Sequence, residues 1–258
     1  MTPARFDRLD ALRGLAMVWM TAFHLVFDLN HAGLVKQDFY RDPFWTWQRV
    51  LIVSLFLFCA GFGQAVATAQ GQSWTRFWKR WAQVAGCALL VSAGSWLMYP
   101  QTFIYFGILH GMALMLMVVR LTAHWGRWLW LLGAFAISSK FIASFALSTW
   151  FGSQLITQMN APGLNWIGWI TQKPVTEDYA PLFPWLGVMW WGAAAGGWLL
   201  HRTGAGPGAN MFLTRPLSKA GRALAVLGRW SLIYYMLHQP VLIGGVMGLV
   251  WLSNQAVG

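Results

Sequence analysis

The sequence predicts an all-α polytopic membrane protein, a bundle of about seven transmembrane helices with a cytoplasmic N-terminus. Of its 258 residues, 57% are hydrophobic and only 10% are charged, whereas soluble domains carry about 25% charged residues. The net charge is +11, but the basic residues lie in short breaks between long apolar runs. This placement follows the positive-inside rule of membrane proteins and argues against a nucleic-acid-binding function.

Each apolar run is long enough to cross a bilayer, which takes about 20 helical residues. The runs lie at 9–30, 45–68, 81–98, 103–121, 127–147, 181–200 and 223–252. The last run contains Pro240, which lacks a backbone N–H and is expected to kink or break the helix. Seven crossings place the C-terminus outside, and a break at Pro240 would give eight. The whole chain, 1–258, is expected to form one membrane domain.

Two connections between the runs are longer than the others. The outer connection at 148–179 is too polar to span the membrane. It nevertheless contains Trp150, Trp166 and Trp169, which suit an interfacial lid. The inner connection at 203–221 is a basic loop rich in Gly and Pro.

The first run carries four polar side chains that are costly inside a membrane: Asp10, Arg13, His24 and Asp28. A charged group at the centre of a transmembrane helix costs about 2.5–3.5 kcal/mol. All four positions fall within an arc of about 60° on a helical wheel, so they are predicted to face the bundle interior together. Asp10 and Arg13 lie near the cytoplasmic end, where they could form an i,i+3 ion pair or contact a bound coenzyme.

His24 and Asp28 are the strongest candidates for chemistry. Their i,i+4 spacing would allow the carboxylate to accept the imidazole N–H and fix its tautomer. His110 in the fourth run and His238 in the last are predicted to lie at a similar depth. The three imidazoles could form a proton relay or an active site. No metal is predicted, because no two histidines have i,i+4 spacing and acidic ligands are scarce.

Three further residues are predicted to bind substrate. Lys140 falls about 18–20 Å along the fifth run and needs either a partner such as Asp28 or a water-filled cavity. Arg49 opens the second run from the outside and is expected to border the same cavity. Tyr235 shares a helical face with His238.

Five ordered segments resemble one protein family. In chain order they read RLDALRGLAMVWMTAFHLVFDLN, LFLFCAGFG, FIYFGILHGMAL, DYAPLFPWLGVMWWG and GRWSLIYYMLHQPVL. Together they resemble the bacterial heparan-alpha-glucosaminide N-acetyltransferase catalytic-domain-like membrane proteins. The first segment is also similar to the first helix of the broader acyltransferase-3-related enzymes, in which a histidine at the position of His24 is considered catalytic.

The resemblance implies an enzyme that moves an acetyl group from cytoplasmic acetyl-CoA across the membrane to an amine or hydroxyl of an extracytoplasmic sugar or glycan. It assigns site roles to His24, Asp28, His110 and His238, and a substrate-binding role to Asp178. It further implies a multi-pass protein of the bacterial inner (plasma) membrane. The expected partners are lipid, acetyl-CoA and the sugar acceptor, and a homo-oligomer is compatible with this reading.

The implied chemistry suits the residues, because acyl transfer from a thioester needs a base or nucleophile of near-neutral pKa in a dry site. His24 could deprotonate the acceptor or carry the acetyl group transiently. Two other classes remain open. A proton-coupled secondary transporter would use Lys140, Asp28 and the histidines as a proton pathway, and a non-catalytic membrane scaffold would use them as buried pairs.

Overall fold

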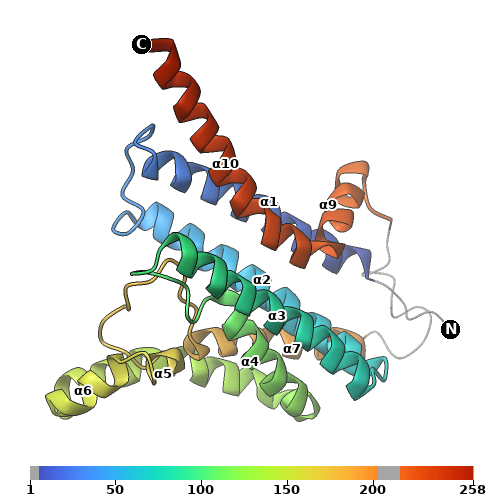
Figure 1. Cartoon of the computed structure of the whole chain (residues 1–258). Coiled ribbons are helices and arrows are strands. Elements are labelled where there is room, and N and C mark those ends of the chain that lie inside the picture. Colours follow the sequence, from blue (N-terminus) through green and yellow to red (C-terminus); the bar gives the residue numbers. More distant parts are fainter. Residues whose placement is uncertain (1–5, 203–215, 258) are drawn as a thin grey trace. The chain divides into compact units, whose positions relative to one another are not determined.

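The described part of the chain consists of helices and the connections between them. The computed structural model describes residues 6–202 and 216–257, and within these ranges it contains no β-strand (Figure 1). The helices are α1 (Asp7–His31), α2 (Pro43–Ala69), α3 (Trp74–Met98), α4 (Ile108–Thr122), α5 (Trp128–Trp150), α6 (Ser153–Asn160), α7 (Leu182–Arg202), α9 (Lys219–Arg229) and α10 (Ser231–Val257). The predicted all-α class is confirmed.

Six of the described helices are long and apolar enough to cross a membrane: α1, α2, α3, α5, α10, and α4 together with the 3₁₀ turn η1 (Ala123–Trp125). The predicted polytopic architecture is confirmed at this level. The predicted span at 181–200 forms α7, but α7 is not among the six. Its middle is rich in Trp, Gly and Ala, which are less apolar than the Leu, Ile and Val of a typical span.

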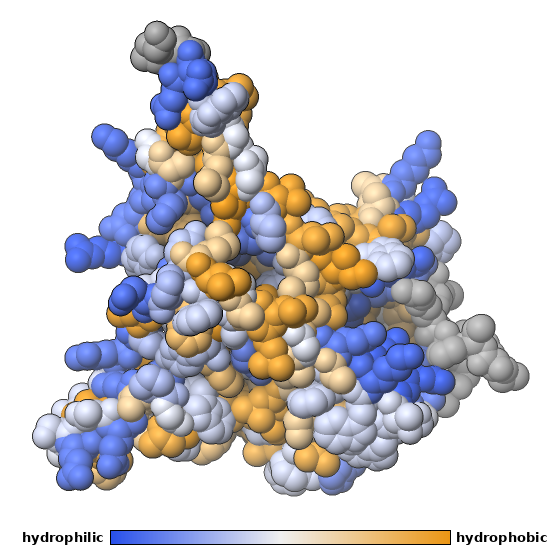
Figure 2. Space-filling model, viewed as in Figure 1, coloured by the Kyte–Doolittle hydropathy of each residue, from blue (hydrophilic) through white to orange (hydrophobic). Residues whose placement is uncertain are grey.

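Apolar side chains also cover the outside of these helices, as contact with lipid requires. On α10, for example, Val241, Met247 and Leu249 are all exposed. Hydrophobic residues, drawn in orange, are widespread on the face seen in Figure 2.

The last predicted span, 223–252, is not a single helix. α9 ends at Arg229, Trp230 caps it, and α10 begins at Ser231. α10 then runs without interruption through Pro240, so the expected break there and the eight-crossing alternative are wrong. Proline removes one backbone hydrogen bond, whereas a break inside an apolar environment would leave several backbone groups without partners.

The two long connections are described to different extents. The outer one, 148–179, contains α6 and the 3₁₀ turn η2 (Asn165–Ile167). Of the inner one, 203–221, residues 203–215 lie outside the described ranges. Its described end leads into α9, whose first turn is capped by a hydrogen bond from the Gly221 N–H to the Ser218 hydroxyl.

The chain forms two compact units. Unit 1 comprises the described residues of Met1–Phe56 and Asn210–Gly258, and unit 2 comprises those of Leu57–Ala209. The boundary falls within α2. Each unit has its own helix packing and its own buried polar groups.

In unit 1, α1 packs against α9 through glycine. A Cβ on Gly14 would overlap the Leu224 carbonyl oxygen, and a Cβ on Gly228 would overlap the Asp10 carbonyl oxygen. The backbones of the two helices are therefore in direct contact, as small residues permit in membrane helices.

The rest of unit 1 is held by an aromatic and methionine core. Met17, Met20 and Phe23 of α1 are buried together with Phe39 from the following connection and Ile52 of α2. Phe39 also stacks on Trp45 with ring centroids 4.3 Å apart. Leu227 of α9 and Tyr234 and Tyr235 of α10 pack against the same core, which therefore joins α1, α2, α9 and α10.

In unit 2, glycines again set the spacing, here between α7 and its neighbours. A Cβ on Gly192 would overlap the Phe58 carbonyl oxygen, and a Cβ on Gly61 would overlap that of Met189. On α5, a Cβ on Gly133 would lie 2.9 Å from the Gly187 carbonyl oxygen. α7 thus sits tightly against both α2 and α5.

We predict that Gly228→Ala destabilises the protein by about 1–3 kcal/mol or more, as overpacking does, because the new methyl group must push α9 away from α1. The matched control is Gly244→Ala in α10, where nothing lies within 4 Å of an added Cβ. The control should unfold at or slightly above the wild-type temperature, since Ala favours helix over Gly. Thermal unfolding of the detergent-purified proteins checks both, and equal melting temperatures for the two variants would contradict the close α1–α9 contact.

The predicted orientation, with the N-terminus in the cytoplasm and the C-terminus outside, can be measured directly. A reporter that is active only in the cytoplasm should be silent when fused after Gly258. The same reporter placed before Met1 should be active. Activity at both ends would mean an even number of crossings.

Candidate functional site

The polar side of α1 faces α9 and α10. Asp10 and Asp28 are 8% and 9% exposed, and each interacts with one of these two helices. His24 lies between them in sequence and contacts α10. The prediction that the costly groups of the first helix face inward together is confirmed within unit 1.

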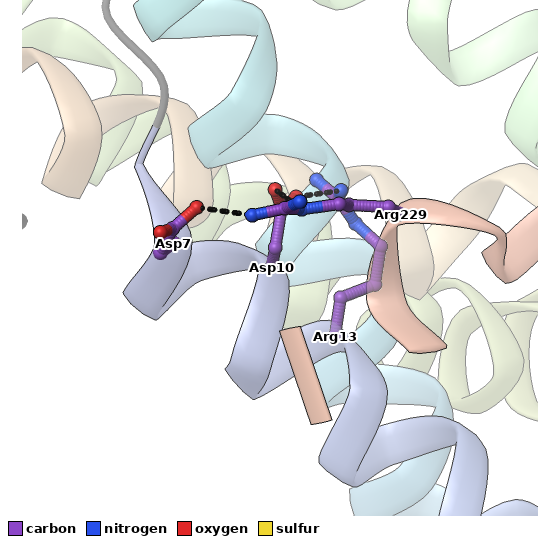
Figure 3. Close-up of polar contacts among 4 residues, drawn as sticks. All are labelled: Asp7, Asp10, Arg13 and Arg229. Atoms are coloured by element: carbon purple, nitrogen blue, oxygen red, sulfur yellow. Dashed lines mark hydrogen bonds and ion pairs between the residues drawn. The ribbon is translucent and has the colours of Figure 1, made fainter. Parts of the chain in front are cut away.

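At the N-terminal end of α1, Asp7, Asp10 and Arg13 form an ionic cluster with Arg229 of α9 (Figure 3). Arg13 Nη1 lies 3.0 Å from Asp10 Oδ1, which is the expected i,i+3 pair. Arg229 of α9 bridges two turns, with Nη2 2.7 Å from Asp7 Oδ1 and Nε 3.7 Å from Asp10 Oδ2. The ion-pair interpretation of Asp10 and Arg13 is confirmed, and their contact with a coenzyme stays a prediction.

Further along α1, His24 meets His238 of α10. Their ring centroids are 5.3 Å apart and the rings are tilted by 59°. His238 is only 8% exposed. Two ring nitrogens, His24 Nδ1 and His238 Nε2, are buried and have no hydrogen-bond partner among the described residues. Two imidazoles from different helices therefore share one buried place, each with a nitrogen available to a ligand.

The backbone of α10 fixes the tautomer of His238. Its Nδ1 lies 2.6 Å from the Tyr235 carbonyl oxygen, and a carbonyl can only accept, so Nδ1 must carry the hydrogen. In the neutral ring, Nε2 is then the nitrogen with the free lone pair. The main chain of Tyr235 thus orients His238, and contact of Tyr235 with substrate stays a prediction.

The ring of Tyr234 also packs against the imidazole of His238. The Tyr234 and His238 rings are stacked, 6.1 Å apart with an angle of 8° between their planes. The Tyr234 hydroxyl is 2.6 Å from the Thr21 hydroxyl of α1. This bond ties α10 to α1 one turn before His24 and fixes the position of both rings.

Asp28 is held by a residue that the sequence did not single out. Gln239 Nε2 donates to the carboxylate, at 3.0 Å from Oδ1 and 3.2 Å from Oδ2. The predicted i,i+4 bond between Asp28 and His24 is therefore replaced by a bond across to α10. The only sequence signal for Gln239 is its place directly after His238.

His110 belongs to unit 2 and has local partners. α4 begins at Ile108, so His110 lies in the first turn rather than well inside the span as predicted. Its Nδ1 accepts from the Gly107 N–H at 3.3 Å, and its Nε2 lies 3.0 Å from the Ser92 hydroxyl. Because Ser92 donates to the Ile104 carbonyl at 2.6 Å, His110 Nε2 must donate to Ser92. Both ring nitrogens are thus occupied by the protein, and a catalytic role stays a prediction.

Asp178 caps the same helix. Its Oδ2 accepts from the Ile108 N–H at 2.7 Å, which satisfies one of the free donors at a helix N-terminus. The neighbouring residue Tyr179 forms a parallel bridge with Phe106. Asp178 therefore supports the start of α4, the turn that contains His110, and its contact with substrate stays a prediction.

A half-buried tyrosine pair, Tyr105 and Tyr179, lies in the connections outside the spans. The Asn165 amide donates to the Tyr105 hydroxyl at 2.7 Å, and the Tyr179 hydroxyl donates to the Asn165 carbonyl at 2.6 Å. Burial raises the pKa of Tyr105 above its ordinary value. Burial, and then the nearby Tyr105, raises the pKa of Tyr179. Both phenols therefore stay neutral and act as hydrogen-bonding groups.

The two remaining predicted residues are placed less specifically. Arg49 lies in the unit 1 part of α2 and is partly exposed. Lys140 lies on α5 in unit 2, with its Nζ 6.0 Å from the ring centroid of Phe141. Its predicted pairing with Asp28, which belongs to unit 1, stays a prediction. Across residues 6–202 and 216–257, no three His, Cys, Asp or Glu side chains are grouped as metal ligands.

Comparison with known proteins adds one match. The family model described as "Heparan-alpha-glucosaminide N-acetyltransferase, catalytic" matches residues 5–240. No curated protein and no solved structure matches the chain. The matched range contains the ionic cluster, both histidines of the α1–α10 contact, and the Asp28–Gln239 pair. Because the match covers most of the sequence, the chain belongs to the heparan-alpha-glucosaminide N-acetyltransferase catalytic family.

Proposed function

We propose that this protein is a membrane-embedded acetyltransferase, which moves an acetyl group from acetyl-CoA to an amine or hydroxyl of a sugar outside the cytoplasm. The observation that carries the proposal is the contact between His24 and His238. Each ring has a buried nitrogen without a hydrogen-bond partner among the described residues. Six of the described helices are apolar and long enough to span a membrane. Membership of the family indicates acetyl transfer. The two histidines provide the nitrogens that can accept the proton which the acceptor loses.

Acetyl transfer from a thioester requires a base. The nitrogen or oxygen of the acceptor attacks the thioester carbonyl carbon and forms a bond to it. The carbon–sulfur bond breaks, and CoA leaves as a thiolate with the electron pair of that bond and is then protonated. The acceptor must lose a proton in this process. His238 Nε2 has the free lone pair for that proton, and imidazole has the near-neutral pKa that general bases need.

His24 is the second participant. Its Nδ1 is buried beside the base, where it can accept the same proton or attack the thioester itself. Attack by His24 would form an acetyl-histidine, from which the acceptor then takes the acetyl group. Direct transfer needs His24 only to orient the acceptor, and the two routes use the same residues.

Asp28 supports the charge that develops on the histidines. Its carboxylate, held by Gln239, lies one helical turn beyond His24 on the same face of α1. A nearby negative charge favours an imidazolium. Asp28 thus lowers the cost of protonating the pair in an environment where water is scarce.

Coenzyme A is expected to approach from the cytoplasmic side, where its phosphates need cations. The ionic cluster uses Arg13 and Arg229 to neutralise Asp7 and Asp10. Two other basic residues of α9, Lys219 and Arg222, have exposed side chains. We expect these two side chains to bind the phosphates of coenzyme A.

The proposed location of the protein is the bacterial inner membrane.

The test of this function is acetyl transfer by the purified protein, with labelled acetyl-CoA and an envelope-glycan extract. Wild-type protein should label a glycan. His24→Gln should fold and bind acetyl-CoA, but its transfer rate should fall by about 10²–10⁴-fold, the usual contribution of an acid–base group. The matched control is His124→Gln, at an exposed histidine of η1 in unit 2, which should transfer at the wild-type rate. Full activity of His24→Gln would return His24 to a structural role.

Asp28→Asn should separate binding from transfer. An asparagine can still accept from Gln239, so the fold and the half-saturating concentration of acetyl-CoA should change little. The maximal transfer rate should fall by about tenfold or more, because the charge that supports the imidazolium is lost. Rates measured over a range of acetyl-CoA concentrations check this, and a loss confined to acetyl-CoA affinity would contradict it.

A further inference from the structure

Gln239 has one half of its side-chain amide committed to Asp28 and the other half uncommitted. A carboxylate oxygen only accepts hydrogen bonds, so the amide nitrogen must be the atom that faces Asp28. Both carboxylate oxygens lie within 3.2 Å of that nitrogen. The opposite atom, Oε1, is buried and has no hydrogen-bond partner among the described residues.

An unpartnered buried carbonyl is costly, because it has lost its hydrogen bonds to water and gained none. Two other such atoms belong to the same contact between α1 and α10. His24 Nδ1 and His238 Nε2 are likewise buried without partners, and all three belong to residues that touch across the α1–α10 contact. Three unsatisfied groups at one contact indicate a place for a polar ligand.

The chemical character of these atoms indicates which ligand fits. Gln239 Oε1 can only accept, and the tautomer of His238 makes its Nε2 an acceptor as well. A ligand that satisfies both must bring hydrogens. A neutral amine has two hydrogens and provides both, and a reacting hydroxyl provides them together with a neighbouring hydroxyl of the same sugar. The acetyl thioester end of acetyl-CoA has no N–H or O–H and cannot bind in this way.

We propose that Gln239 is a substrate-binding residue that accepts a hydrogen bond from the N–H or O–H of the acceptor through Oε1, while its Nε2 holds Asp28. This proposal rests on the proposed acetyl transfer and adds the residue that selects the acceptor. One acceptor hydrogen is held by Gln239 and stays in place during transfer. The proton that is removed goes to His238 Nε2. Gln239 therefore aligns the acceptor with the base.

Two variants separate the two halves of the amide. Gln239→Lys keeps a donor to Asp28 but has no acceptor atom. The double variant Asp28→Asn/Gln239→Glu reverses the pair, so that an amide at position 28 donates to a carboxylate whose second oxygen still accepts. If Gln239 only holds Asp28, both should bind the acceptor normally. If Oε1 binds the acceptor, only the double variant should.

The measurement uses labelled acetyl-CoA with serial dilutions of the envelope-glycan extract. For Gln239→Lys we expect the half-saturating amount of extract to rise by about tenfold, the loss of one hydrogen bond, and that of acetyl-CoA to stay within about twofold. The double variant should need no more than about threefold more extract than the wild type. Should Gln239→Lys fail to fold, Asp28→Asn/Gln239→Met takes its place, since it is neutral and also lacks the acceptor atom.

Gln48→Met is the matched control. Gln48 is a glutamine of the same unit whose Oε1 already accepts from Trp19 Nε1 at 2.7 Å, so its loss should lower thermal stability without changing the acceptor dependence. An equal rise in half-saturating extract for Gln48→Met, or wild-type acceptor dependence of Gln239→Lys, would overturn the role of Gln239 while the transfer function stands. No labelling by the wild type would overturn the proposed function, and this role with it.

Discussion

The fold of unit 1 depends on the need to compensate polar groups on a helix that is otherwise apolar enough to span a bilayer. An uncompensated charge at membrane depth is too costly for a marginally stable protein. α1 meets this requirement by turning its polar side toward α9 and α10. The ionic cluster, the histidine contact and the Asp28–Gln239 pair are three solutions along one helix. These three groups differ in how many of their polar atoms have a hydrogen-bond or ion-pair partner.

That difference distinguishes polar groups that stabilise the fold from polar groups that can act on a ligand. In the ionic cluster, Asp7, Asp10, Arg13 and Arg229 pair their charges with one another, which links α1 to α9. At the histidine contact, two buried nitrogens have no partner within the part of the chain that the structure describes, which is costly unless a ligand uses them. His110 provides the contrast within the same chain, because Ser92 and Gly107 occupy both of its ring nitrogens.

The sequence was a good guide to local structure and a poor one to partners. The span predicted at 9–30 is α1, because a long apolar run with one polar side has few alternatives in a membrane. The break at Trp230 was missed, since an apolar run shows no change in composition where a helix ends for reasons of packing. The bond between His24 and Asp28 was predicted from i,i+4 spacing, but Gln239, more than 200 residues away, competes for the same carboxylate. Only the tertiary register of α10 on α1 brings Gln239 there, and a single sequence does not contain that register.

The glycine contact between α1 and α9 has a consequence for how this chain can change over evolution. α9 is anchored on α1 by backbone contact at Gly228, and α10 follows after the single residue Trp230. The anchor therefore sets where each residue of α10 meets α1. Inserting or deleting one residue between Ser231 and His238 would turn the rest of the helix by about 100° and shift it by about 1.5 Å, which would take His238 away from His24. This short stretch should accept changes of its exposed side chains, such as Ile233 and Leu237, but no change of length.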